Sequence, residues 1–362
     1  MRGALVNIAF FGSSLVSAYW NGACTYYRGI VRALHERGHR ITFFEPDAFD
    51  RQAHRDIDDP EWAEVVVYPA ETKEDVRATV RRAEGADVIV KASGVGVFDD
   101  VLEAAVLELK QPGNTIVFWD VDAPATLGAM ESDPAKHLRG LVPEFDFVFT
   151  YGGGDLVVDR YRGLGASRCI PVYNALDETT HRPVGPDPRY EGDLAFLGNR
   201  LPDREARVEE FFFRAVEAAP TRRFVLGGAG WDDRAGAPNL TYVGHVSPQD
   251  HNAFNCSSLA VLNVSRESMA SNGYSPATRV FEAAGAGACL ITDAWEGIDM
   301  FLEPDEEVLV AHSGAEVADL LEGLSPEHAA RIGDAARRRI LRDHTYARRA
   351  EEVEAILEAA RV

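Results

Sequence analysis

Cysteine and lysine are scarce in this chain, and their scarcity removes several kinds of site. The four cysteines among the 362 residues form no C-x-x-C pair, which argues against a disulfide framework or a thiolate zinc site and fits a reducing compartment. No lysine lies in a glycine-rich phosphate-binding loop, and no G-x-S-x-G motif occurs. P-loop and serine-hydrolase chemistry are therefore excluded. The residues concerned are Cys24, Cys169, Cys256, Cys289, Lys73, Lys91, Lys110 and Lys136.

Positive charge and long apolar runs are also in short supply. The 37 Lys and Arg residues face 58 Asp and Glu residues, for a formal net charge of −21. Such a field repels nucleic-acid backbones and anionic lipid surfaces, so we expect neither as a partner. The longest apolar stretches, such as 259–264, have strand length and fall far short of the ~20 residues that span a bilayer. The chain starts directly in a strand pattern without separate signal regions, so we expect a soluble cytoplasmic protein.

Strand and helix patterns alternate along the whole chain, which indicates parallel sheets covered by helices. A proline-rich, aperiodic segment from about 171 to 193 interrupts this rhythm. We therefore predict an α/β fold of two doubly wound, Rossmann-like domains, with the ligand in a cleft between the carboxyl ends of their sheets. The predicted parts are an N-terminal domain over 1–172, a linker over 173–192, a C-terminal domain over 193–345, and a final helix over 346–362 that can cross back to the first domain.

The most informative segment is residues 275–287, SPATRVFEAAGAG. Ser275 is a good N-cap and Pro276 suits the first helical position, so we predict a helix whose N-terminus favours an anion such as a diphosphate. Arg279 and Glu282 lie three apart on one face of that helix. A guanidinium there can pair with phosphate, and the carboxylate can accept both hydroxyls of a ribose. An ordinary amphipathic helix with a surface Arg–Glu pair explains the pattern equally well.

Two longer stretches resemble a known fold family. TRVFEAAGAGACLITD, residues 278–293, resembles the donor-site helix and strand of GT-B glycosyltransferases. With NGYSP before it, the segment is most similar to the spore-maturation (CgeB-like) glycosyltransferase group. Residues 242–266, YVGHVSPQDHNAFNCSSLAVLNVSR, resemble the GT-B succession of strand, glycine-rich loop, short helix and strand. The similarity extends over roughly 193–345 and is architectural over the first half.

This resemblance implies a glycosyltransferase with a nucleotide-diphosphate sugar as donor and no cofactor or metal. It implies that Glu282 binds the ribose. Retaining members often carry a second glutamate eight residues earlier; Tyr274 stands at that position here, so retention or inversion stays open. The other implied donor-side residues are Gly198, Asn199, Arg200, Arg266 and Arg279 near the diphosphate, His245 near the base, and Ser275 at the start of the helix.

The first domain offers weaker candidates after two of its predicted strands. Asp120 and Asp122 follow the strand ending in FWD, where a carboxylate can deprotonate an acceptor hydroxyl. Asp122 is the first candidate for this base and Asp120 the second, although capping of a loop or helix explains both about equally well. Ser13, Ser14 and Asn21 follow the first strand and are candidates for the acceptor or phosphate side, with an ordinary surface turn as the commoner role.

Two other functions stay open beside glycosyl transfer. One is a GT-B-like nucleotide-sugar epimerase, which would turn over the donor without an acceptor. The other is a non-catalytic nucleotide-sugar-binding partner, which Tyr274 in place of a glutamate makes conceivable.

His245 and His251 lie six apart, unlike metal ligands on one helical face, so we expect no metal site. The acceptor and the oligomeric state do not follow from the sequence.

Overall fold

The computed structural model describes residues 5–360, which form two compact units. Unit 1 combines Met1–Tyr173 with Tyr346–Val362, and unit 2 is Asn174–Thr345. The chain therefore leaves unit 1 after Tyr173 and returns to it after Thr345. The outer limits of the expected first domain and final helix, residues 1–4 and 361–362, lie outside the described residues.

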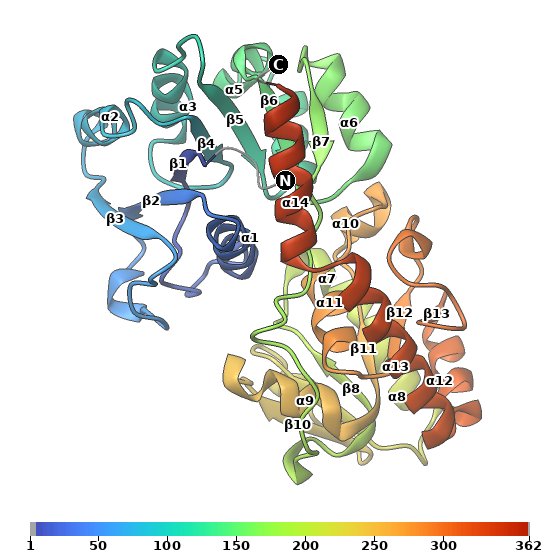
Figure 1. Ribbon diagram of the computed structural model, residues 1–362. Coiled ribbons are helices and arrows are strands. Elements are labelled where there is room, and N and C mark those ends of the chain that lie inside the picture. The colour runs from blue at the N-terminus through green and yellow to red at the C-terminus, as the bar shows by residue number, and fades with distance from the viewer. Residues whose placement is uncertain (1–4, 361–362) are drawn as a thin grey trace. The chain divides into compact units, whose positions relative to one another are not determined.

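Unit 1 is built on a sheet of seven parallel strands in the order β3-β2-β1-β4-β5-β6-β7 (Figure 1). The strand order reverses at β1, which pairs with β2 on one side and β4 on the other. The strands are β1 (Asn7–Phe11), β2 (Arg40–Asp47), β3 (Glu64–Pro69), β4 (Val88–Ala92), β5 (Thr115–Asp120), β6 (Phe147–Thr150) and β7 (Cys169–Pro171). The helices are α1 (Cys24–Glu36), α2 (Lys73–Arg81), α3 (Asp99–Glu108), α4 (Ala123–Ser132), α5 (His137–Leu141), α6 (Gly154–Gly163) and α14 (Tyr346–Ala359).

The C-terminal helix α14 packs within unit 1 against α1. At Gly29, in α1, a Cβ would lie 2.2 Å from the ring of Tyr346, so only glycine admits the ring there. The same ring lies edge-on to Tyr26, with centroids 5.9 Å apart. The segment predicted as a closing helix is therefore part of the first unit's core.

Unit 2 repeats the same order on a sheet of six parallel strands, β10-β9-β8-β11-β12-β13. The order reverses at β8, which pairs with β9 and β11. The α/β prediction of two doubly wound sheets is confirmed. The strands are β8 (Gly192–Leu197), β9 (Phe224–Gly227), β10 (Leu240–Gly244), β11 (Ser258–Asn263), β12 (Leu290–Asp293) and β13 (Leu309–Ala311). The helices are α7 (Pro202–Val208), α8 (Arg214–Ala218), α9 (His251–Ser257), α10 (Glu267–Asn272), α11 (Thr278–Gly285), α12 (Gly314–Gly323) and α13 (Pro326–Asp343).

Residues 202–218 form a continuous helical segment that is not regular. A π-helical turn, Glu209–Phe213, joins α7 to α8. It contains three consecutive phenylalanines, 211–213, that are all buried in the core of unit 2. The wider turn spreads successive side chains over a narrower arc than an α-helix does, which lets all three face the sheet.

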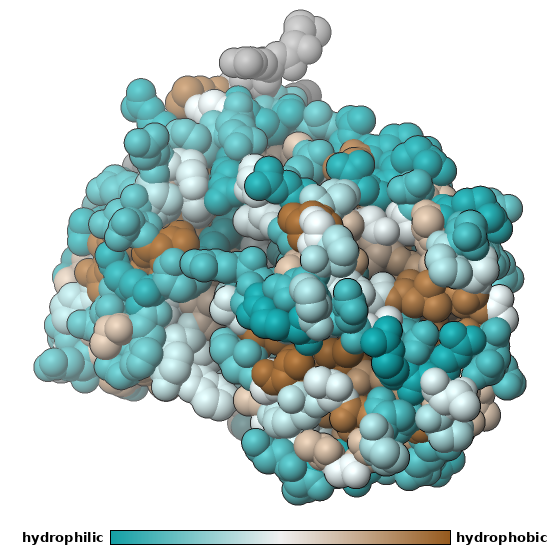
Figure 2. Space-filling model, turned by 90° about the horizontal axis from the view of Figure 1, so that it is seen from below, coloured by the Kyte–Doolittle hydropathy of each residue, from teal (hydrophilic) through white to brown (hydrophobic). Residues whose placement is uncertain are grey.

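The surface shown in Figure 2 is mainly hydrophilic, and its apolar side chains form separate patches. This agrees with the large excess of acidic residues in the sequence. Within residues 5–360, no helix combines the length and the apolar character that crossing a membrane requires.

Candidate active site

The loops at the strand-order reversal of unit 2 contain most of the predicted donor-side residues. Residues 198–201 follow β8 and residues 264–277 follow β11, and these two strands pair in parallel. Both loops therefore leave the same edge of the sheet, beside each other. In doubly wound sheets this is where ligands bind.

Three arginines at this point are near enough to act on one another electrostatically: Arg204, Arg266 and Arg279. Arg279, on α11, has a side chain only 14% exposed and donates from Nη1 to Asn255 Oδ1 at 3.3 Å. Arg204, on α7, donates to the carbonyl oxygen of Asn199 at 2.5 Å. Burial and the positive charges of Arg279 and Arg266 lower the pKa of Arg204 to about 10. An anion would offset both the burial of this cation and the repulsion by its neighbours, so these arginines are suited to a diphosphate.

Arg204 was missed in the sequence analysis. Its guanidinium lies directly on the turn after β8, since a Cβ at Gly198 would be 2.7 Å from Nη2. The sequence does offer one signal for Arg204: it is a basic residue in the first turn of the helix that follows the turn at Gly198. Its equally basic neighbour Arg200, which was predicted, is instead held by Glu205 at 2.5 Å and Asp233 at 2.7 Å.

Glu282 lies one turn further along α11 and is 9% exposed. Its Oε2 is 3.6 Å from Arg279 Nη1, and its Oε1 is 3.9 Å from His181 Nε2. Burial would raise the pKa of this carboxyl, but Arg279, with His181 and His251, brings it below the usual value. Glu282 is thus an ionised, largely buried acceptor beside a cation cluster.

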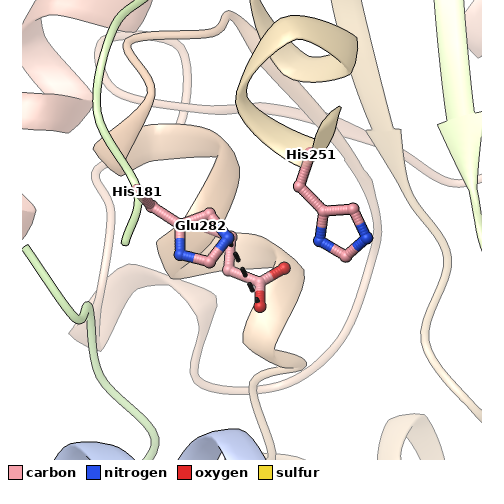
Figure 3. A group of neighbouring side chains, drawn as sticks. All are labelled: His181, His251 and Glu282. Carbon is pink, nitrogen blue, oxygen red and sulfur yellow. Dashed lines mark ion pairs between the residues drawn. The ribbon is translucent and has the colours of Figure 1, made fainter. Parts of the chain in front are cut away.

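Two histidines that the sequence analysis did not connect with Glu282 lie beside it (Figure 3). His181 comes from the segment between Asn174 and β8, and His251 is the first residue of α9. The three residues are far apart in the chain, so no sequence spacing signals their approach. The predicted base-side residue His245 follows β10, two strands from β8, and is exposed.

The loop before α11 differs from the prediction in its details. The expected N-cap at Ser275 is wrong, because α11 begins at Thr278 with Ala277 in the N-cap position and no side-chain capping bond. Ser275 Oγ donates instead to the carbonyl of Gly273 at 2.9 Å. Tyr274 has a φ of +46°, and its ring lies on Gly297, where a Cβ would be 2.3 Å away. The loop is shaped by these local contacts rather than by a capping box.

Helix α7 holds this loop in place through two carboxylate contacts. Asp203 accepts from Arg266 Nε at 2.9 Å and from Ser268 Oγ at 2.7 Å. Arg207 donates to the buried Asp293 at 2.7 Å, and Asp293 accepts the backbone N–H of Ser265 at 2.9 Å. One helix therefore supplies Arg204 and also orients the loop that carries Arg266.

In unit 1, Asp120 and Asp122, at and after the end of β5, have different surroundings. Asp120 is fully buried and accepts from Ser93 Oγ at 2.7 Å, Thr126 Oγ1 at 2.8 Å and the Tyr161 hydroxyl. This satisfied carboxylate ties together the loops after β4 and β5, so it acts as a structural group. Asp122 is half-buried at the N-cap position of α4, and its side chain makes no capping bond. Of the pair, Asp122 is the one that is not fully buried.

The residues after β1 are engaged within their own loop. Ser13 Oγ donates to Asn21 Oδ1 at 2.9 Å, and Asn21 Nδ2 donates to the Ser14 carbonyl at 2.9 Å. Ser14 Oγ donates to the buried Glu45 at 3.1 Å. These bonds fit the turn that the sequence analysis considered the commoner role, but Ser13 and Ser14 are buried, so its expected place at the surface is wrong for them.

Comparison with known proteins adds a family match for part of the chain. Residues 204–355, from α7 into α14, match the family model described as glycosyl transferase-like. No curated protein matches the chain in sequence.

Several solved structures share the fold over 98% of this chain. A sucrose-phosphate synthase from Thermosynechococcus elongatus has a TM-score of 0.71 at 13% identity, with 99% of its own chain covered. HepE from Anabaena, in complex with UDP and glucose, has a TM-score of 0.68 at 14% identity and 100% coverage. AviGT4, a glycosyltransferase involved in avilamycin A biosynthesis, has a TM-score of 0.62 at 17% identity and 98% coverage. The common fold and the family match together identify the chain as a glycosyltransferase of the GT-B type.

Proposed function

We propose that this glycosyltransferase takes a nucleotide-diphosphate sugar at the strand-order reversal of unit 2 and transfers its sugar without a divalent ion. The observation that carries the proposal is the convergence of Arg204, Arg266 and Arg279 beside the ionised, buried Glu282. The arginines suit a diphosphate, and a carboxylate one helical turn away suits the two hydroxyls of a ribose. The UDP and UDP-glucose complexes of HepE support a uridine donor as the first to be tested.

In this mechanism the acceptor oxygen attacks the anomeric carbon while the bond from that carbon to the diphosphate oxygen breaks. Negative charge grows on the leaving diphosphate, where the three guanidinium groups stabilise it in a largely buried setting. Asp122 is our proposed base, which takes the proton of the acceptor hydroxyl. In this proposal the three arginines stabilise the leaving diphosphate, as a metal ion does in other transferases, and no cofactor is needed.

Thermal unfolding of the EDTA-treated protein tests the donor site. We expect UDP, GDP, dTDP or CMP, or one of their sugars, to raise the melting temperature, since a ligand at 100 times its Kd adds roughly 2.7 kcal/mol of stability. Glu282→Ala should abolish the shift, and Glu306→Ala, an exposed glutamate of the same unit, should keep it. A shift with NAD alone, or with none of these ligands, would refute the proposal.

The sequence analysis left two other functions open, and product analysis separates them from transfer. Donor turnover without an acceptor would indicate a nucleotide-sugar epimerase, and binding without turnover would indicate a non-catalytic partner.

Within the transferases we propose that the chain belongs to the CgeB-like group, because of the motif around Tyr274. The four cysteines are free, which supports the proposed cytoplasmic location.

A further inference from the structure

His181, His251 and Glu282 form a compact group of potential metal ligands. One ligand atom from each of the three lies within 4.8 Å of the other two. The residues come from three separate segments: the stretch before β8, helix α9 and helix α11 (Figure 3). In Figure 3 one ring nitrogen of each histidine faces the carboxylate. Two imidazoles and a carboxylate are the ligand set of several zinc sites.

Two contacts of Thr180 bear on the tautomer of His181. Thr180 Oγ1 donates to the Asp177 carbonyl at 3.2 Å and lies 2.9 Å from His181 Nδ1, a contact whose direction depends on the tautomer. In the neutral tautomer with its proton on Nδ1, the Thr180 hydroxyl accepts that proton and the lone pair is on Nε2, the atom 3.9 Å from Glu282 Oε1. Two acceptor atoms thus face each other, an arrangement that a cation between them would stabilise.

His251 is largely buried, and burial lowers its pKa to about 4, against a raising effect of the Val246 backbone. A neutral imidazole has one donor and one acceptor nitrogen. Metal-bound histidines usually donate their other N–H to a carbonyl or a similar oxygen, and Thr180 and the backbone of Val246 lie where they can accept it.

The neighbouring Arg279 leaves room for this role. It lies on the other carboxylate oxygen, 3.6 Å from Oε2, and it is also bonded to Asn255. Oε1 remains directed at His181. Zn²⁺ holds such ligands at about 2.0–2.2 Å, which sets tetrahedral ligand atoms about 3.4 Å apart. Side-chain rotation can close the present separations of at most 4.8 Å.

We propose that His181, His251 and Glu282 bind a transition-metal ion of the Zn²⁺ type, and that this ion competes with the ribose of the donor for Glu282. Metal binding itself goes beyond the proposed function, whereas the competition rests on it. The ion is then an inhibitor of a transferase that needs no metal. Bound metal and bound donor must weaken each other by the same factor.

Co²⁺ titration of the metal-free full chain, without nucleotide, tests the site. Because Co²⁺ in a nitrogen and oxygen site of low coordination absorbs visible light, we expect a saturable band at one equivalent, displaced by Zn²⁺. His181→Ala and His251→Ala should each abolish the band. Thr180→Val, which removes only the acceptor for Nδ1, should weaken Co²⁺ binding by about 10–100-fold. His312→Ala, an exposed histidine of the same unit, is the control and should bind Co²⁺ normally.

Three outcomes would overturn the proposal in whole or in part. An absent band, or a band unchanged in both histidine variants while their circular dichroism shows a folded chain, refutes the metal site whatever UDP does. Loss of the band in the His312→Ala control refutes its location. Simultaneous binding of Co²⁺ and UDP without loss of affinity refutes the competition. If Co²⁺ binds as expected and no nucleotide binds, the proposed function fails and the metal site stands.

Discussion

The guanidinium of Arg204 lies against the backbone of Gly198, so close that a Cβ there would be 2.7 Å from Nη2. A strand-end turn and a charged side chain from the following helix thus form one continuous surface. The arginine is bonded to the next carbonyl, that of Asn199, and its Nε is buried without a hydrogen-bond partner. A buried cation with unused donor capacity is costly by itself and becomes favourable when an anion binds.

Arg204→Met should therefore weaken UDP binding by about 10–100-fold, the range for a lost hydrogen bond to a charged group. The free energy of unfolding should change little, because the substitution also removes repulsion by Arg266 and Arg279. Isothermal titration calorimetry and urea denaturation measure the two quantities. Arg214→Met, an exposed position paired only with Glu210, is the matched control. Unchanged UDP affinity in Arg204→Met would contradict the assignment.

Glu282 should make the protein sensitive to the 2′-hydroxyl of the donor. Wild-type protein should bind 2′-deoxy-UDP about tenfold or more weakly than UDP, since a charge-assisted hydrogen bond is lost. Glu282→Ala should bind both ligands weakly and equally. Competition binding with the two nucleotides in EDTA measures the difference. Discrimination that survives in Glu282→Ala would place the ribose elsewhere.

Asp122→Asn should lower kcat by about 10²–10⁴, the usual contribution of a general base, with little effect on the KM for the donor. The amide keeps the size of the side chain but cannot take a proton from the acceptor. Initial rates at saturating acceptor measure this, once a donor is known. Asp159→Asn, an exposed aspartate in the same unit, is the control. A normal kcat in Asp122→Asn would eliminate this base.

Asp56 should give unit 1 a pH-dependent contribution to stability. It accepts two hydrogen bonds from Arg28 at 2.8 Å and one from the Ala18 backbone at 2.9 Å, and so ties down the loop after β1. Burial acts to raise the pKa of Asp56, but these bonds bring it below the usual value of 3.8 for an aspartate. A depressed folded-state pKa stabilises the protein above pH 3.8, and this stabilisation is lost as the pH falls through the folded-state value.

Asp56→Asn should accordingly lower the free energy of unfolding by about 1 kcal/mol at pH 7, a modest value because the pair is partly exposed. The difference from wild type should shrink as the pH falls below 3.8. Urea denaturation across this range measures it, with the exposed Asp58→Asn as control. A difference independent of pH would mean that the contribution is not electrostatic.

Much of the fold could be predicted because its signals are local. Apolar runs of strand length and helical periodicity located β1, β5, β11 and α11. The helix that carries Arg279 and Glu282 was found in this way, although its start lies at Thr278 rather than after a cap at Ser275. A helix start depends on which backbone bonds form, and here Ser275 Oγ donates to the Gly273 carbonyl instead of capping the helix.

By itself the sequence determined the two doubly wound sheets, the acidic surface and the arginine and glutamate of α11, because each follows from composition or from residues within one turn or strand. Only the tertiary structure decided which charged groups meet. It buried Asp120 among three hydroxyl donors, engaged Arg200 with Glu205 and Asp233, and brought Arg204 and two histidines to the ends of β8 and α11. Most of these contacts join residues far apart in the chain. They depend on strand order and on the paths of loops, which no local pattern encodes.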